Sequence, residues 1–365
     1  MTAAIARWHD DFGVACTLDP VQALLATEAD RLAEIWQRCA PGGGVDVLAE
    51  DLPAWLRSLV LGGGKRVRPS MCHWGFAAAG GRPGTSGHDA VVRVGAALEI
   101  LHTFALIHDD VMDDSDTRRG QPAAHVVAAR AHRAAGAAGD SHEFGVNLAI
   151  LLGDLAHAQA DRLVGDLPGP LRDRWFDLSV ELIVGQRADL TGAAARRRDL
   201  PHAEAVARLK SGAYTVQRPL LMGALAAGAD DGAYAALADY GRAVGQVFAL
   251  RDDLLGIWGD PARTGKPAGD DLRDGKATVI LGLAAEMVSG AAAEALERVG
   301  TPAARDTDVP LLLRRLAEAG VRDRVEAMIR EGVEDAAAAL TDAPLTAAGV
   351  TGLIAMAERI AWRDS

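Results

Sequence analysis

The sequence predicts an all-α fold, organised as a single-domain helical bundle. Strong helix formers such as alanine, leucine, arginine and glutamate are abundant along the 365 residues, whereas β-branched and aromatic runs are few. Apolar residues recur at helical spacing, as in Leu98, Leu101, Ala105 and Met112, and strict alternation of apolar and polar residues is hard to find. Hydrophobic residues make up 49% of the chain, which is enough for a packed core and excludes global disorder.

Capping and breaking residues predict where each helix begins and ends. Asp19 as N-cap and Pro20 in the first turn open a helix that we expect to run to Ala40, before Pro41 and three glycines. The segments between helices are too short for interdomain linkers, so one domain is expected. Further helices are expected over residues 46–60, 67–79, 88–114, 121–133, 142–164, 170–190, 203–228, 231–258, 276–288, 309–319, 321–340 and 346–362.

Charge and cysteine content exclude several classes of protein. The net charge of −12 disfavours a nucleic-acid binder, which needs a basic stripe. Three widely spaced cysteines indicate neither a disulfide framework nor a zinc site, so a reducing cytoplasm is expected. The N-terminus lacks the pattern of a secretory signal, and the most apolar stretch, residues 91–107, contains Arg93 and Glu99, so no membrane span is expected.

A cluster of aspartates closes the long apolar segment at residues 88–114. Asp109 and Asp113 lie one helical turn apart, as do Asp110 and Asp114. Carboxylates this close repel each other unless a cation lies among them, and hard oxygen ligands favour Mg²⁺. The alternative is a solvent-exposed acidic helix end, which the negative end of the helix dipole disfavours.

A second acidic pair, Asp252-Asp253, follows another apolar stretch at residues 245–250. Alone, this pair would be weak evidence for a metal site. Two acidic clusters, each at the end of an apolar helix, favour two walls of one metal-lined cavity, because bundles build such sites from facing helices.

Basic residues supply possible anion sites. Three glycines precede Lys65, Arg66 and Arg68 and the start of a helix, although the spacing is not that of a P-loop. Arg118-Arg119 follow the first acidic cluster, where a plain salt bridge is a fair alternative for one of the two. Together, the acidic clusters, the cations and the apolar helix indicate a ligand with a phosphate head and a hydrocarbon tail, on which Mg²⁺ acts as a Lewis acid.

The sequence resembles the trans-isoprenyl diphosphate synthases, or polyprenyl synthetases, of the short-chain type that makes geranylgeranyl or farnesyl diphosphate. The resemblance runs from about residue 45 to the C-terminus. Its motifs are Gly-Gly-Lys-Arg-x-Arg-Pro at residues 63–69, Asp-Asp-x-x-Asp at 109–113, Arg-Arg-Gly at 118–120, Gly-Gln-x-x-Asp at 185–189, Lys-Ser in place of Lys-Thr at 210–211, a second aspartate motif from 252, Thr-Gly-Lys at 264–266 and Lys-x-Thr at 276–278.

The resemblance implies an all-α bundle around a deep central cavity, usually a homodimer, with residues 1–44 as an N-terminal extension and 45–365 as the catalytic domain. It implies Mg²⁺, three ions with substrate bound. The implied metal-binding residues are Asp109, Asp110, Asp113, Asp252 and Asp253. Those implied for isopentenyl diphosphate are Lys65, Arg68, His102 and Arg119. Those implied for the allylic diphosphate or for substrate binding more generally are Arg118, Gln186, Lys210, Ser211, Lys266 and Lys276. Asp109, Asp110, Asp113, Arg118, Lys210 and Asp252 are the implied catalytic residues.

Two departures from the family pattern concern the second aspartate motif. Gly256 stands where the family has its third aspartate, and Ala249 stands where the family often has glutamine after Phe248. The resemblance also implies that the helix before Asp109 measures product length, with Leu101, Phe104 and Ala105 along it. The bulky Phe104 beside the small Ala105 indicates a C20 product, with C15 as the second choice.

Two other functions fit part of the pattern. A class I terpene cyclase shares the helical fold and an aspartate-rich motif, but it would need a different second metal motif and no site for isopentenyl diphosphate. A catalytically silent regulatory subunit fits the departures at Ala249 and Gly256. The intact first motif and the arginine pair at 118–119 disfavour it.

Overall fold

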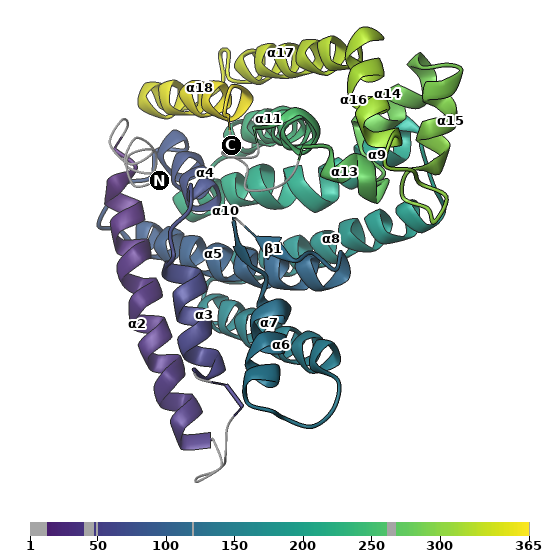
Figure 1. Ribbon diagram of the computed structural model, residues 1–365. Helices are drawn as coiled ribbons and strands as arrows, with labels where there is room; N and C mark the ends of the chain where they lie inside the picture. Colours follow the sequence, from purple (N-terminus) through teal and green to yellow (C-terminus); the bar gives the residue numbers. More distant parts are fainter. Residues whose placement is uncertain (1–12, 40–46, 49, 119, 261–267, 365) are drawn as a thin grey trace. The chain divides into compact units, whose positions relative to one another are not determined.

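The computed structural model describes residues 13–39, 47–48, 50–118, 120–260 and 268–364 (Figure 1). These residues are mostly helical, with one two-stranded β ladder among them, which confirms the all-α prediction. The chain divides into two compact units, residues 1–73 with 81–172 and residues 74–80 with 173–365.

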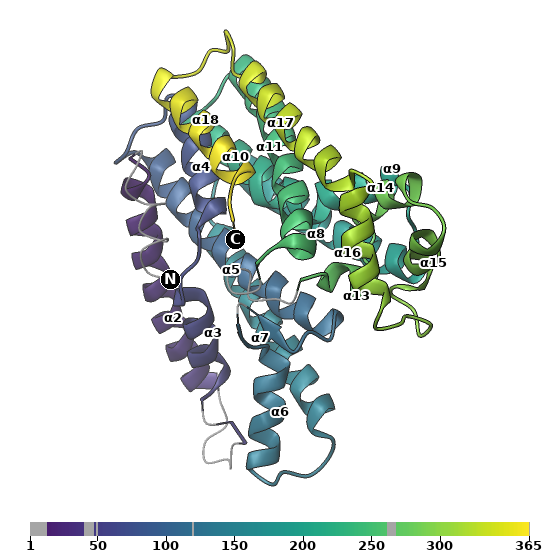
Figure 2. The ribbon, with the colours of Figure 1, turned by 45° about the horizontal axis from the view of Figure 1, so that its top comes forward.

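The first unit contains a helical layer built around one long buried helix. Helix α5 lies against α2 and α7, and α2 runs beside α3 (Figure 2). The unit's elements are α2 (Ala15–Cys39), α3 (Leu52–Leu61), the start of α4 (Val67–Ala78), α5 (Ser86–Met112), β1 (Thr117–Arg118), β2 (Gln121–Pro122), α6 (Ala124–Ala134) and α7 (Ser141–Val164).

Helix α5 is the core helix of the first unit. The Thr85 side chain accepts a hydrogen bond from the His88 backbone N–H and caps its N-terminus, and Asp89 adds a favourable charge in the first turn. Its middle is mostly apolar, and Leu98 and Leu101 are fully buried. By length and composition α5 would pass for a membrane span, but 67% of its apolar window is buried inside the protein, as in the core helix of a globular unit.

Helix α2 begins one turn before the expected N-cap. The backbone N–H groups of Thr17 and Leu18 both donate to the Val14 carbonyl, at 2.9 and 3.0 Å, so the first turn forms upstream of Asp19. Pro20 therefore lies inside the helix rather than at its start. Because Pro20 is the sixth residue of α2 and has no N–H, it cannot donate the helical hydrogen bond to the carbonyl of Cys16, four residues before it.

The second unit is built around α11, which packs against η1, α10, α17 and α18. Tyr240 of α11 is fully buried and donates its hydroxyl to the Leu353 carbonyl of α18 at 2.6 Å. The unit's elements are α8 (Gly169–Ala194, from residue 173), α9 (Leu200–Val206), η1 (Ala207–Gln217), α10 (Arg218–Ala227), α11 (Asp231–Trp258), α13 (Asp270–Asp274), α14 (Val279–Met287), α15 (Ala291–Arg298), α16 (Asp308–Glu318), α17 (Val321–Ala339) and α18 (Ala347–Ala361).

Four segments differ from the sequence prediction. The helix expected over 203–228 is split into α9, the π-helix η1 and α10. The start of the helix expected at 121–133 is instead strand β2, which pairs with β1. Helices α13 and α15 lie in segments without expected helices, and both are at most eight residues long, too short for helical periodicity to show.

Candidate functional site

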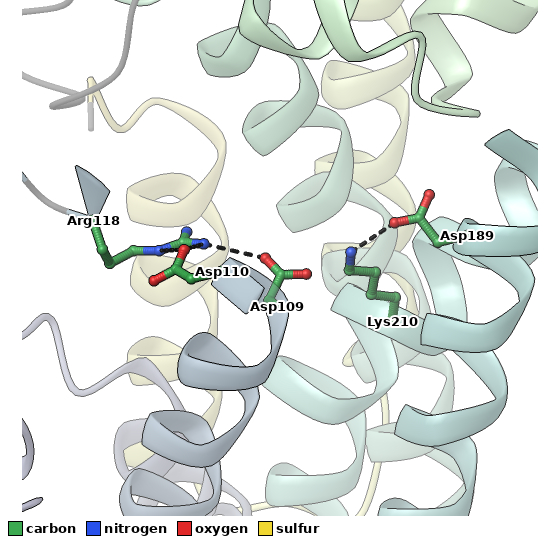
Figure 3. A network of polar contacts seen from close by, with 5 residues as sticks. All are labelled: Asp109, Asp110, Arg118, Asp189 and Lys210. Carbon is green, nitrogen blue, oxygen red and sulfur yellow. Dashed lines mark hydrogen bonds and ion pairs between the residues drawn. The ribbon is translucent and has the colours of Figure 1, made fainter. Parts of the chain in front are cut away.

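The first acidic group lies at the C-terminal end of α5 in the first unit. Asp109 and Asp110 occupy its last turn, and Asp113 is its C-cap residue. Asp110 is buried, whereas Asp109 is partly exposed. Arg118 bridges the two carboxylates: its Nε donates to Asp110 Oδ1 at 2.8 Å and its Nη2 to Asp109 Oδ2 at 3.2 Å (Figure 3).

A small β ladder returns Arg118 to this helix end. In the antiparallel pair of β1 and β2, Thr117 lies opposite Pro122 and Arg118 opposite Gln121. Gly120 takes a φ of +72° in the turn between them, a conformation that costs glycine little. Burial acts to lower the pKa of the Arg118 guanidinium, but its hydrogen bonds and charge interactions with Asp110 and Asp109 raise that pKa above its ordinary value. The salt bridge considered for one of the two arginines is therefore formed by Arg118.

The donor atoms of the first acidic group suit a hard divalent cation. Asp109 and Asp113 lie one helical turn apart and offer carboxylate oxygens, the ligands that Mg²⁺ prefers. Within the described part of the chain, no three carboxylate, imidazole or thiol groups are already gathered closely enough to hold an ion. A cation binding to Asp109 or Asp110 therefore competes with the Arg118 guanidinium.

The basic turn before α4 is held by Arg66, which the sequence analysis named only as one of three cations of a possible anion site. Arg66 has a φ of +51°, uncommon for a residue with a side chain, and is buried. Its guanidinium forms a buried ion pair with Glu99 of α5 and donates to Gln22 Oε1 at 2.9 Å and to the Val60 carbonyl at 3.0 Å. Arg66 thus fixes the turn between two predicted anion-binding residues.

Those two residues differ in exposure. Lys65, next to Arg66, is half-buried, whereas Arg68 is buried in the first turn of α4. On α5, His102 is half-buried and lies seven residues before Asp109, a spacing that puts both on one side of the helix.

The three predicted chain-length residues lie along α5. Leu101 is fully buried, and Ala105 is half-buried one turn before Asp109. The Phe104 ring packs 4.6 Å from the His108 ring and 4.8 Å, edge to face, from that of His157 on α7. Phe104 therefore points toward α7.

The second acidic group lies on α11 in the second unit. Asp252 is exposed and forms an ion pair with Arg363, near the C-terminus. The Arg363 guanidinium also donates to the Phe248 carbonyl at 3.2 Å and lies 4.2 Å from the centre of the Phe248 ring. The sequence did not indicate Arg363, because its partner lies more than a hundred positions away.

Asp253 has the most perturbed environment of this group. Burial, followed by the charges of Asp271 and Asp252, raises the pKa of its carboxyl well above the ordinary value. Its Oδ2 atom is buried and has no hydrogen-bond partner among the residues that the structure describes. A buried oxygen among like charges is favourable only when a cation or a proton compensates it, so these residues fit a divalent metal.

Lys210 and Asp189 form another ion pair of the second unit. The Lys210 Nζ donates to Asp189 Oδ2 at 2.6 Å (Figure 3). Lys210 lies in the π-helix η1, a rare element that is often found at functional sites. A Cβ on Gly212 would lie 2.7 Å from the Gly245 carbonyl oxygen, so η1 approaches α11 this closely only because both positions lack side chains.

Three of the remaining predicted substrate-binding residues lie in the second unit. Gln186 is half-buried on α8, one turn before Asp189, and Ser211 is half-buried beside Lys210. Lys276 is half-buried just after α13. Arg119 and Lys266 lie outside the described residues.

Comparisons with known proteins give a consistent result. The model of the family described as polyprenyl synthetase matches residues 50–314. A geranylgeranyl diphosphate synthase of Mycobacterium tuberculosis is 35% identical over 307 residues, which cover 82% of this chain and 80% of the relative. A geranylfarnesyl diphosphate synthase of Aeropyrum pernix is 30% identical over 295 residues, 78% of this chain and 86% of that protein.

A solved structure is also similar over nearly the whole chain. It is a geranylgeranyl pyrophosphate synthase from Corynebacterium glutamicum, complexed with isoprenyl diphosphate and magnesium. It is 38% identical, with a TM-score of 0.85, and the match covers 95% of this chain and 99% of that one.

Proposed function

The chain belongs to the polyprenyl synthetase family, and we propose on that premise which of its residues carry out the reaction. It is a trans-prenyltransferase that joins isopentenyl diphosphate to an allylic diphosphate and makes a short-chain prenyl diphosphate. The observation that best supports the assignment is the acidic end of α5, where Asp109 and Asp110 close a buried apolar helix and a guanidinium compensates them.

Mg²⁺, in three ions with substrate bound, is proposed to neutralise the allylic diphosphate and to polarise its leaving oxygen. Its proposed ligands are the carboxylates of the first acidic group, Asp109, Asp110 and Asp113, with Asp252 and Asp253 of the second. Arg118, Lys210 and Lys266 would add positive charge as the C–O bond breaks, which lowers the barrier by stabilising the departing diphosphate.

Isopentenyl diphosphate is the second substrate in the proposal. Lys65, Arg68, His102 and Arg119 would hold its diphosphate, with the Arg66–Glu99 pair fixing the turn that carries Lys65. Its double bond attacks the allylic cation, a C–C bond forms, and a proton leaves to the released diphosphate. Positioning and the exclusion of water therefore do most of the protein's work.

We propose geranylgeranyl diphosphate as the product, with farnesyl diphosphate as the second choice. One helical turn rises about 5.4 Å, close to the length of a five-carbon unit, so positions along α5 can limit chain growth. Phe104 supports this proposal, because its ring packs against the rings of His108 and His157.

Phe104→Ala is expected to lengthen the product, because it removes the bulk nearest the small Ala105. The measurement is chromatography of products made from a C15 primer, with Leu151→Ala on an exposed position of α7 as the matched control. An unchanged distribution of chain lengths would rule out Phe104 as the limit.

The proposed assembly is a cytoplasmic homodimer. Helix α8 supports it, because large apolar side chains recur on one of its faces at positions 176, 180, 183 and 184 and remain exposed. Phe176, 68% exposed, is the most prominent of them.

One assay separates the synthase from its two rivals. The purified protein is incubated with Mg²⁺, radiolabelled isopentenyl diphosphate and each of the C5, C10 and C15 allylic primers. Labelled, elongated diphosphates are expected. Hydrocarbon formed from an allylic primer alone would indicate a terpene cyclase, and no turnover with any primer would indicate a silent subunit.

A further inference from the structure

The loop between α8 and α9 carries three consecutive arginines, and Arg198 differs from the other two. Arg196 and Arg197 are exposed, and Arg197 donates two hydrogen bonds to the Asp199 carboxylate, both at 2.8 Å. Arg198 is half-buried, and this burial lowers the pKa of its guanidinium, while the charge of Glu297 on α15 opposes the change. Burying a guanidinium is favourable only when its donors find partners, so the partners of Arg198 indicate its role.

The guanidinium of Arg198 caps the end of a helix that lies 77 positions along the chain. Its Nη1 atom donates to the Gly275 carbonyl at 3.1 Å and to the Arg197 carbonyl, within its own loop, at 3.0 Å. Gly275 is the C-cap residue of α13 and adopts a φ of +63°. The last carbonyls of a helix have no partner within that helix, and an arginine side chain can supply one. Arg198 therefore ties the α8–α9 loop to the end of α13.

The turn at Gly275 is also held from a second side. A Cβ built on Gly275 would lie 2.8 Å from the Cα atom of Gly300, so this close approach requires glycine. The backbone N–H of Gly300 donates to the Arg273 carbonyl at 3.1 Å. The turn is thus fixed between the α8–α9 loop and the segment that follows α15.

This turn leads directly into the Lys-x-Thr element. Lys276 follows Gly275, and its backbone N–H donates to the Asp271 carbonyl at 3.2 Å. Two residues later, Thr278 is the N-cap of α14, and its side chain accepts a hydrogen bond from the Leu281 N–H at 3.3 Å. Because the backbone is fixed on both sides of Lys276, the position of the Gly275 turn determines where the lysine side chain starts.

We propose that Arg198 is a positioning residue for Lys276, because its hydrogen bond to the Gly275 carbonyl fixes the turn from which the lysine side chain extends. This inference rests on the proposed function, in which Lys276 binds a diphosphate substrate. Arg198 acts on the backbone one residue before the lysine, so it needs no contact with the substrate.

The experiment measures the binding of inorganic pyrophosphate, in the presence of Mg²⁺, by calorimetric titration of four full-length proteins. These are the parent, Arg198→Met, Lys276→Met and the double variant. Arg198→Met removes the donors and is expected to weaken pyrophosphate binding roughly three- to tenfold, the scale of one net hydrogen bond. In the Lys276→Met background the same substitution should change the dissociation constant by less than about twofold, because residues that act as one unit are not additive.

Arg197→Met is the matched control, because Arg197 is the exposed neighbour in the same loop and pairs with Asp199. It should bind pyrophosphate as the parent does. Arg198→Lys keeps a charge and a donor, so it should bind more tightly than Arg198→Met, and it replaces that variant in the comparison if Arg198→Met does not fold. Melting temperatures measured alongside show which variants are folded during the titration.

Parent-like pyrophosphate affinity in Arg198→Met, or an equal loss of affinity with and without Lys276, would overturn the inference. The prenyl transfer assay of the parent protein separates this failure from that of the proposed function. A parent that elongates primers while Arg198→Met binds pyrophosphate normally refutes the role of Arg198 alone.

Discussion

Arginine side chains form ion pairs with several of the carboxylates that we propose as Mg²⁺ ligands. Arg118 pairs with Asp109 and Asp110, and Arg363 pairs with Asp252. The sequence could indicate the aspartates, because they are adjacent in the chain and follow apolar helices. It could not indicate Arg363, since this residue reaches Asp252 only through the folding of a distant segment.

Removing Arg363 is expected to strengthen metal binding, because its guanidinium competes with a cation for the exposed Asp252. Arg363→Ala should bind Mn²⁺ alone about two- to fivefold more tightly, the scale of a partly exposed ion pair. Calorimetric titration measures the change, and Arg363→Lys, which keeps the charge, is the control. Weaker Mn²⁺ binding in Arg363→Ala would show that Arg363 supports the site instead of competing for it.

At the scale of elements, the sequence predicts long helices well and short or irregular ones poorly. Helices α5 and α11 each contain long apolar stretches that follow helical periodicity and closely match their expected ranges. The π-helix η1 was missed because it depends on the close approach of Gly212 to Gly245, a contact between segments. The sequence indicated the basic turn. It could not show that Arg66 is the buried residue that anchors this turn, because Arg66 is one of three closely spaced basic residues.

The Arg66–Glu99 pair ties the basic turn to α5, and both side chains are buried. Arg66→Met should therefore lower the free energy of unfolding by about 3–5 kcal/mol, because it leaves Glu99 buried without its partner. Urea denaturation measures the loss. The double variant Arg66→Met with Glu99→Leu removes both charges and should be more stable than Arg66→Met. If Arg66→Met alone proves as stable as the parent, the pair does not anchor the turn.

At the scale of the whole molecule, the negative net charge disfavours the binding of negatively charged substrates. The chain carries a net charge of −12, yet both proposed substrates are diphosphates. We therefore expect local cations such as Lys65, Arg68 and Lys210, together with Mg²⁺, to set the electrostatic potential at the proposed diphosphate sites. The sequence predicted the all-α class correctly, while the central cavity and the division at residue 45 stay predictions.

The homodimer gives a prediction at this scale. Phe176→Glu places a charge on the exposed apolar face of α8 and should shift the protein from dimer to monomer. Sedimentation velocity measures the shift in oligomeric state. The control is Asp173→Glu on the same helix, which keeps the negative charge at position 173. A Phe176→Glu protein that stays dimeric would place the interface elsewhere.

The central claim is that the Asp109 and Asp252 carboxylates are each needed for transfer of the allylic group to isopentenyl diphosphate. Single-turnover prenyl transfer in the parent, Asp109→Asn and Asp252→Asn tests it most directly, with isopentenyl diphosphate binding measured alongside. The account predicts that the parent elongates the primer, and that each variant loses roughly 100-fold or more in rate, on the scale of losing one stabilising group in the transition state, while binding isopentenyl diphosphate normally. A parent-like rate in either variant would contradict it.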